Sequence, residues 1–188
     1  MHLIAVVITG TARGMKLTTL EGLDVRPTTD QVKESIFSII QFEVEGARVL
    51  DLFAGSGQLG IEALSRGASS ATFIDQSRAA VNVINENLEH TKLAKNAIVK
   101  NEDSLGFLDF SKDTFDIAFL DPPYGKGLIE AALPKLVERM SDAGVIICET
   151  SKEESLPSEV GKFYQKREYK YGKIKLTVFR VKEENSDD

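Results

Sequence analysis

Two spacings of apolar residues alternate along the middle of the chain. Short apolar runs rich in β-branched residues occur at 47–53, 70–75, 96–100, 115–121 and 144–150. Between them, residues 58–67, 77–93 and 127–140 carry apolar side chains at helical spacing, and Pro134 predicts a kink or break in the last of these segments. Strands that alternate with helices predict an α/β fold with a mostly parallel sheet covered on both faces. Such sheets bind ligands at the C-terminal ends of their strands.

The two ends of the chain follow different patterns. Residues 163–181 form two runs of period two around Gly172, which predicts a β-hairpin that adds two antiparallel strands and makes the sheet seven-stranded. At the start, residues 3–10 predict a strand, residues 11–17 a turn and return, and residues 26–40 a helix that enters through Pro27. Thr28 and Gln31 fit a capping box for that helix.

These patterns divide the chain into three parts. We expect a small N-terminal β-hairpin and helix extension over residues 1–43 and one α/β domain over residues 44–182. The last residues, 183–188, are mostly acidic and have no apolar side chain to bury, so they are predicted to be a disordered tail.

Composition and charge narrow the classes of function. The net charge of the 188 residues is −6, yet residues 161–182 are strongly basic. The single cysteine, Cys148, excludes an internal disulfide and is typical of a reducing compartment, so we expect a cytoplasmic protein. One cysteine and two distant histidines argue against a zinc cluster, and no metal is expected. No apolar stretch has the length of a membrane span and the N-terminus lacks the order of a secretory signal, so no membrane partner is expected.

A glycine-rich segment, DLFAGSGQLG at 51–60, joins the first of the five central strands to the following helix. Gly55, Gly57 and Gly60 satisfy G-x-G-x-x-G, in which glycines let the backbone turn sharply and approach a ligand closely. The helix after them directs its first N–H groups at that ligand. The motif alone does not identify the ligand, because purely structural matches are about as frequent as real sites.

Acidic residues at the strand ends favour one ligand over another. Asp75 ends the second central strand, where nucleotide-binding α/β folds place an acid that accepts hydrogen bonds from ribose hydroxyls. Asp51 stands just before the glycine loop, and its carboxylate would pair with the amino group of S-adenosylmethionine but would repel the pyrophosphate of a dinucleotide. Asp103, after the third strand, either contacts the adenine amino group or caps the following helix, and the sequence leaves both roles open.

The segment DPPY at 121–124 follows the fourth central strand. The exocyclic amine of a base is a poor nucleophile, and Asp121 and the carbonyl of Pro122 would accept hydrogen bonds from both of its protons. The ring of Pro123 holds that carbonyl in place, and Tyr124 would stack on the base. A plain rigid turn is the alternative, but it leaves unexplained an acid and an aromatic ring at the ligand-binding edge. The segment therefore predicts methyl transfer to an amino group of a base.

Together, RPTTDQVKESIFSII, the glycine loop, SRGASSATFID and DPPY resemble the RsmD family of Rossmann-like class I methyltransferases. The resemblance spans about residues 8–181. It implies methylation of the N2 amine of one guanine in 16S ribosomal RNA, within the small ribosomal subunit or its assembly intermediate, by a monomeric enzyme. S-adenosylmethionine would be the cofactor and S-adenosylhomocysteine the product.

The resemblance also implies roles for individual residues. The cofactor would be bound by Asp51, Phe53, Ala54, Gly55, Gly57, Asp75, Gln76, Asp103 and Ser104. The catalytic residues would be Asp121, Pro122, Pro123 and Tyr124. The RNA would be bound by Arg13, Lys16, Arg26, Thr28, Thr29 and Lys33. The basic hairpin at 163–181 would extend this patch, unless its lysines only protect an edge strand from aggregation.

Other functions remain open at this stage. A DNA or RNA adenine-N6 methyltransferase, or a protein glutamine methyltransferase, would use similar chemistry, although such enzymes usually carry an additional recognition domain. A nicotinamide-dependent dehydrogenase would share the glycine pattern, but no plausible catalytic pair of the Tyr–Lys or His kind stands near the loop. A non-catalytic RNA-binding assembly factor with a degenerate methyltransferase fold would not need an intact DPPY segment.

Overall fold

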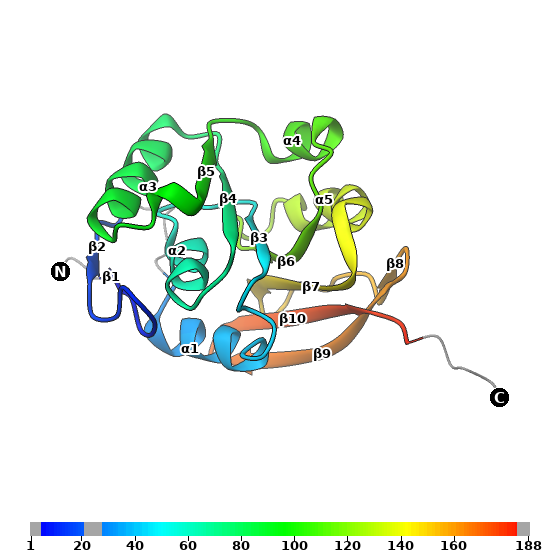
Figure 1. The fold of residues 1–188 in the computed structure, drawn as a ribbon. Helices are drawn as coiled ribbons and strands as arrows, with labels where there is room; N and C mark the ends of the chain where they lie inside the picture. Colours follow the sequence, from blue (N-terminus) through cyan, green and yellow to red (C-terminus); the bar gives the residue numbers. More distant parts are fainter. Residues whose placement is uncertain (1–4, 21–27, 184–188) are drawn as a thin grey trace.

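An eight-stranded sheet forms the centre of the protein in the computed structural model, which describes residues 5–20 and 28–183 (Figure 1). The strand order is β5-β4-β3-β6-β7-β10-β9-β8. The parallel strands are β3 (Arg48–Asp51), β4 (Ser70–Ile74), β5 (Ala97–Lys100), β6 (Phe115–Leu120) and β7 (Met140–Ser151). The antiparallel strands are β8 (Glu159–Val160), β9 (Phe163–Tyr171) and β10 (Ile174–Val181). The α/β fold with a mostly parallel sheet and an antiparallel C-terminal hairpin is thus confirmed.

The strand count differs from the predicted seven because of β8. This strand has only two residues, which pair with Tyr164 and Phe163 of β9. Two residues are too few to show the alternation of apolar and polar side chains that predicts a strand, so the sequence gives no signal for β8. Residues 184–188, most of the predicted acidic tail, lie outside the described residues.

Helices cover both faces of the sheet. On one face lie α1 (Asp30–Ile39), α2 (Gln58–Ser65) and α3 (Arg78–His90), and on the other lie α4 (Ser104–Phe110) and α5 (Leu128–Leu136). Each face of the sheet packs against its helices in a hydrophobic core of its own. Successive residues of one strand, such as Ile146 and Ile147, therefore lie in different cores. Strands buried on both faces need continuous apolar runs, which explains the pattern in the sequence. None of the helices in the described ranges is long and apolar enough to cross a membrane.

The first turn of α1 corrects one sequence prediction. The N-cap is Thr29, whose hydroxyl accepts a hydrogen bond from Val32 N at 3.3 Å. The predicted capping box of Thr28 and Gln31 is therefore wrong by one residue. The difference matters because the Thr28 hydroxyl reaches another element, at the end of β6.

Pro134 lies inside α5 without breaking it. The helix continues to Leu136 and then tightens into a short 3-10 turn, Val137–Arg139. A proline removes one helical hydrogen bond, and the change to 3-10 geometry after it is common at helix ends. Of the predicted kink or break at Pro134, the break does not occur.

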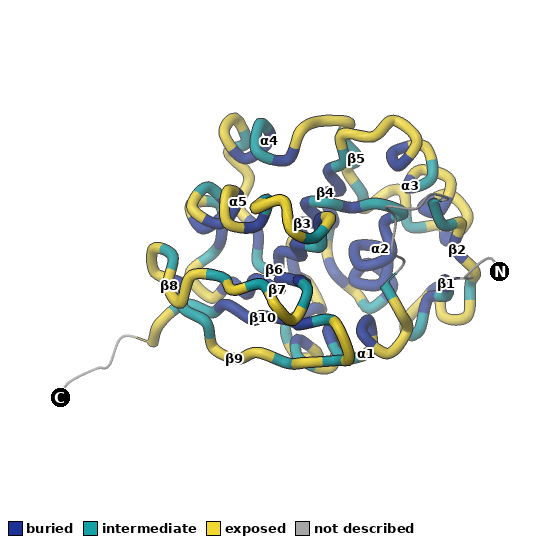
Figure 2. Tube along the Cα trace, turned by 180° about the vertical axis from the view of Figure 1, so that it is seen from behind, coloured by how far each residue is buried: buried dark blue, intermediate teal, exposed yellow. Residues whose placement is uncertain are grey.

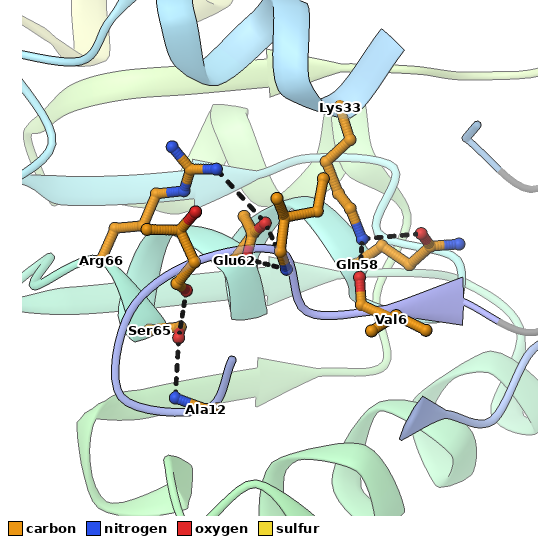
Figure 3. Close-up of polar contacts among 9 residues, drawn as sticks. Val6, Ala12, Lys33, Gln58, Glu62, Ser65 and Arg66 are labelled. Carbon is orange, nitrogen blue, oxygen red and sulfur yellow. Dashed lines mark hydrogen bonds and ion pairs between the residues drawn. The ribbon is translucent and has the colours of Figure 1, made fainter. Parts of the chain in front are cut away.

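A separate two-stranded hairpin, β1 (Ala5–Val6) and β2 (Lys16–Leu17), shares a hydrophobic core with α1 and α2. Polar side chains fix it to these helices (Figure 3). Lys33 Nζ donates a hydrogen bond to the carbonyl of Val6 at 2.6 Å, and Ser65 Oγ accepts one from Ala12 N at 2.9 Å. The hairpin is therefore held by hydrogen bonds at β1 and at the turn between its two strands.

Glu62 is the central anchor of this hairpin. It belongs to α2, which is buried along its whole length (Figure 2), and its side chain is fully buried. Its two oxygens accept hydrogen bonds from Ile8 N at 2.9 and 3.2 Å, and one of them pairs with Arg66 at 3.5 Å. A buried carboxylate is tolerable only when it is paired and hydrogen-bonded in this way.

We predict that Glu62→Ala destabilises the protein by about 3 kcal/mol, because it leaves the amide of Ile8 and the buried charge of Lys33 without their acidic partner. Urea unfolding measures the loss. Glu89→Ala, an exposed position on α3, serves as the matched control and should change stability by less than about 0.5 kcal/mol. Equal effects of the two substitutions would contradict the anchoring role.

Candidate active site

The glycine loop connects the end of β3 to the start of α2. Gly55 and Gly57 have φ of 59° and 83°, in the left-handed region that favours glycine. A Cβ added at Gly55 would meet no atom within 4 Å, so the space beside this residue is open. Gly60 has a different purpose, because a Cβ there would lie 2.3 Å from the ring of Phe73. The first two glycines shape the loop, and the third lets α2 pack closely against β4.

Asp51 lies beneath this loop at the C-terminal end of β3. Its side chain is only 2% exposed, and Oδ2 accepts a hydrogen bond from Gly60 N at 3.1 Å. Burial raises the pKa of this carboxyl to about 7; the Gly60 N–H opposes that shift, and the charge of Asp75 adds to it. The group is thus poised between its neutral and charged forms near neutral pH.

Asp75 fixes the loop from the end of β4. Its Oδ2 accepts a hydrogen bond from Gly55 N and its Oδ1 one from Ser77 N, both at 2.9 Å. Each carboxylate oxygen can accept further hydrogen bonds, as a pair of ribose hydroxyls requires. The side chain of the next residue, Gln76, is exposed at the same edge.

The start of α4 lies beside the same edge. Asp103 is the N-cap of α4 and accepts a hydrogen bond from Gly106 N at 2.9 Å, so the capping role left open by the sequence is confirmed. The buried hydroxyl of Ser104 donates to the carbonyl of Leu52 at 2.6 Å and thereby ties α4 to the glycine loop. Of the residues between β3 and the glycines, Ala54 is buried and Phe53 is half-buried.

The DPPY segment begins where β6 ends, next to β3 in the sheet. Thr28 Oγ1 donates a hydrogen bond to Asp121 Oδ2 at 3.3 Å, which brings the segment before α1 against the acid. The Tyr124 hydroxyl donates to Glu149 Oε1 at 2.9 Å. A cavity of about 180 Å³ adjoins the segment, and its lining includes Pro122, Pro123, Tyr124, Glu149 and Leu156.

Glu149 is a site residue that the sequence analysis missed. It lies on β7, is 6% exposed and contacts Tyr124 directly. Leu120 of β6 pairs with Cys148 of β7, so Asp121 and Glu149 follow side by side in the register. An acid at the C-terminal end of a strand was the available signal, the same one that marks Asp51, but it stood inside the apolar run GVIICE.

The neighbouring acids and the burial of Asp121 change the pKa of its carboxyl. Burial raises the pKa of Asp121 well above its usual range, the charge of Glu149 raises it further, and Asp51 adds a smaller effect. The Thr28 hydrogen bond opposes this shift. Three acids on the adjacent strands β3, β6 and β7 therefore converge on one edge of the sheet.

The predicted RNA-binding residues are only partly supported by their positions. The side chains of Arg13 and Lys16 are exposed on the N-terminal hairpin, Thr29 is exposed and Thr28 is half-buried. Arg26 lies outside the described residues.

Lys33 requires a correction. Its side chain is fully buried, and its Nζ donates to the Val6 carbonyl and, at 3.4 Å, to Gln58 Oε1 (Figure 3). Burial lowers the pKa of this lysine, although the charge of Glu62 opposes the shift. Such a side chain cannot reach an RNA phosphate, so its role is to hold the hairpin in place.

Asn87 links the hairpin to the glycine loop. Its side-chain amide accepts a hydrogen bond from Thr18 N at 2.8 Å and donates to the carbonyls of Thr18 and Ser56 at 2.9 and 3.0 Å. The residue is buried on α3. The chain that leaves β2 is thus attached to the loop that precedes α2.

Comparison with known proteins identifies the family. The model of a family described as "Conserved hypothetical protein 95" matches residues 5–180. A relative from Escherichia coli strain K12, named "Ribosomal RNA small subunit methyltransferase D", is 35% identical over 184 residues, which cover 97% of this chain and 92% of the relative. The chain belongs to the RsmD family. The resemblance found in the sequence is therefore confirmed.

Further members of the RsmD family agree with this assignment. A relative from Haemophilus influenzae with the same name is 39% identical over 155 residues, which cover 80% of each chain. The solved structure of the Escherichia coli protein yhhF superposes with a TM-score of 0.83 at 34% identity, covering 96% of this chain and 99% of that one. Within the described residues, no group of three or more His, Cys, Asp or Glu side chains is arranged to hold a metal ion.

Proposed function

We propose that this RsmD-family chain transfers a methyl group from S-adenosylmethionine to the exocyclic N2 amine of a guanine in 16S ribosomal RNA. The observation that carries the proposal is the position of Asp121 and the Pro122 carbonyl. They follow the end of β6, one strand away from the glycine loop, and Pro122 also lines the cavity next to this segment. The names of the relatives support ribosomal RNA of the small subunit as the substrate.

The residues around the glycine loop fit S-adenosylmethionine. The left-handed turn at Gly55 leaves open space, and Gly57, the N-cap of α2, has no side chain that could bond the first N–H groups of the helix. In that first turn, Gly60 N donates to Asp51. Asp51 would pair with the amino group of the methionine portion, and Asp75 would accept hydrogen bonds from the ribose hydroxyls. Phe53, Ala54, Gly57, Gln76, Asp103 and Ser104 would complete the contacts. When bound, the cofactor supplies an activated methyl group on a positively charged sulfur.

The DPPY segment would prepare the amine for attack. The lone pair of an exocyclic amine is delocalised into the base, and two acceptors that bind both N–H protons localise it. Asp121 and the Pro122 carbonyl would be those acceptors, and the fixed φ of Pro123 limits their movement. Tyr124, held by its hydroxyl, would stack on the base and set the direction of attack.

Basic side chains near the site would bind the RNA backbone. Lys170 and Lys173 are exposed at the turn between β9 and β10, at the end of the sheet where β7 reaches Ser151. A groove between α1 and β9, lined by Tyr169, Tyr171 and polar residues of α1, lies on the same side. With Arg13 and Lys16, these lysines would supply local positive charge on an acidic protein.

We predict that Asp121→Ala lowers methyl transfer by at least about 100-fold while the affinity for S-adenosylhomocysteine changes less than about twofold. Small ribosomal subunits from cells that lack the gene are the substrate, and the methylated nucleotide is identified by mass spectrometry. The matched control is Asp113→Ala, an exposed acid just before β6. Full activity of Asp121→Ala, or methylation at a base other than guanine, would contradict the proposal.

Rapid methylation of a short RNA hairpin would exclude assembled or partly assembled subunits as the required substrate.

The pKa of Asp51 gives a second prediction. Because this pKa is raised to about 7, the carboxyl is mostly neutral at pH 6 and must lose its proton to pair with the ligand's ammonium group. Affinity for S-adenosylhomocysteine should therefore rise roughly eightfold from pH 6 to pH 7.5, with proton release on binding. Calorimetry in buffers of different ionisation enthalpy measures both effects. Asp51→Asn should abolish the rise and Asp113→Asn should retain it; a flat profile in the unmodified protein would contradict the assignment.

A third prediction concerns the basic turn. The double substitution Lys170→Glu and Lys173→Glu should weaken binding to small subunits about tenfold and reduce its dependence on salt. The control is Lys95→Glu with Lys112→Glu, which changes the net charge equally at exposed positions outside this turn. Binding is followed by fluorescence anisotropy at several salt concentrations. If both pairs weaken binding equally, only the overall charge matters and the turn is not a contact.

A further inference from the structure

The methyl-transfer scheme above uses Glu149 only as the acceptor for the Tyr124 hydroxyl, yet its surroundings suggest a larger role. It contacts the Tyr124 hydroxyl at 2.9 Å, lines the cavity and lies beside Asp121 across the β6–β7 register. A carboxylate that is 6% exposed is costly to bury, and an amide or an apolar side chain would fill the same volume. Its position therefore calls for a functional explanation.

The surroundings of Glu149 and Asp121 are mostly acidic. Asp51 adds a further negative charge from β3, and Thr28 contributes only a hydroxyl. Lys175 of the neighbouring β10 is occupied elsewhere, by the Glu154 carbonyl and by Glu168 at 3.4 Å. The cavity that Glu149 lines also includes Lys126, Glu130 and Glu154.

Glu149 is buried and Asp121 is half-buried beside it, so it is unfavourable for both carboxyls to be charged, and this favours one proton shared between them. A proton on Asp121 would remove the acceptor that the base amine needs. If the shared proton lies on Glu149, or has left both carboxyls, Asp121 is charged and can accept a hydrogen bond from the amine.

We infer that Glu149 is a positioning residue that holds the Tyr124 ring through its hydroxyl and sets the charge on Asp121 by sharing a proton with it. The inference rests on the proposed methyl transfer to an amine. As the N–C bond forms and the S–C bond breaks, the amine nitrogen becomes positive and gives up one proton. The charged Asp121 accepts this proton, and Glu149 beside it provides the path toward the cavity and the solvent.

The pH profile of kcat tests the charge effect. Measurements at saturating S-adenosylmethionine report the bound state, in which Asp51 would already be paired. The substitution Glu149→Gln retains an oxygen for the Tyr124 hydroxyl but removes the negative charge next to Asp121. We expect the acidic limb of the profile to move to lower pH by about one unit. The control Glu138→Gln, at an exposed position on the turn after α5, should leave the profile unchanged.

A double-mutant cycle tests the positioning effect. Glu149→Leu and Tyr124→Phe each remove the same hydrogen bond, so the double variant should lose little more kcat than Glu149→Leu alone. Additive losses would overturn the positioning role. Should Glu149→Leu fail to fold, Glu149→Gln still decides the charge effect.

The outcomes separate this inference from the proposed function. If the unmodified protein methylates small subunits but Glu149→Gln leaves the acidic limb unmoved, the inference about Glu149 is wrong and the function stands. If the unmodified protein transfers no methyl group to RNA at any pH, the proposed function itself fails.

Discussion

The site depends on the register of three parallel strands, β3, β6 and β7. Their hydrogen-bonded ladder fixes where each strand ends, and the acids at those ends form a row in which Asp51 and Glu149 are buried and Asp121 is half-buried. Burial is the main reason why the pKa values of Asp51 and Asp121 are raised. Repulsion from Asp75 adds to the shift at Asp51, and repulsion from Glu149 and Asp51 adds to the shift at Asp121. A ligand that carries positive charge would reduce the repulsion between these acids. The row of acids therefore favours the binding of cationic ligands over neutral or anionic ones.

The N-terminal hairpin matters because it is attached to this edge at several points. Glu62 and Lys33 fix the hairpin to α2 and α1, and Asn87 connects its exit to the glycine loop. Further along the chain, Thr28 touches Asp121. A segment that carries exposed basic residues is thereby joined to both the glycine loop and Asp121, which would give the proposed RNA contacts a physical route to the proposed chemistry.

Short continuous apolar runs predicted the central strands, because both faces of these strands are buried. The predicted ends of the strands then pointed to Asp51, Asp75 and Asp121 as candidate site residues. The errors have a common cause. Lys33 is among the RNA-binding residues that the family resemblance implies, and only its tertiary contacts with Val6 and Gln58 show that it is buried. A lysine is rarely fully buried, so its residue type gives no signal of this position. Glu149 was hidden inside an apolar run, and its partner Tyr124 is 25 residues away in the chain. Sequence patterns report local environment, and these roles are set by residues distant in the sequence.

The acidic net charge and an RNA substrate are compatible because the two signs of charge occupy different places. Electrostatic interactions in physiological salt fall off over about 8 Å, so a phosphate responds to the side chains near it and hardly to the total of −6. Asp51 and Glu149 are buried and Asp121 is half-buried at the ends of their strands, where they would meet a base edge and a cationic cofactor. Lys170 and Lys173 are exposed at the same end of the sheet, where a backbone would pass. Their low exposure would keep these acids away from the phosphates and still let Asp121 bind the amine of the proposed substrate.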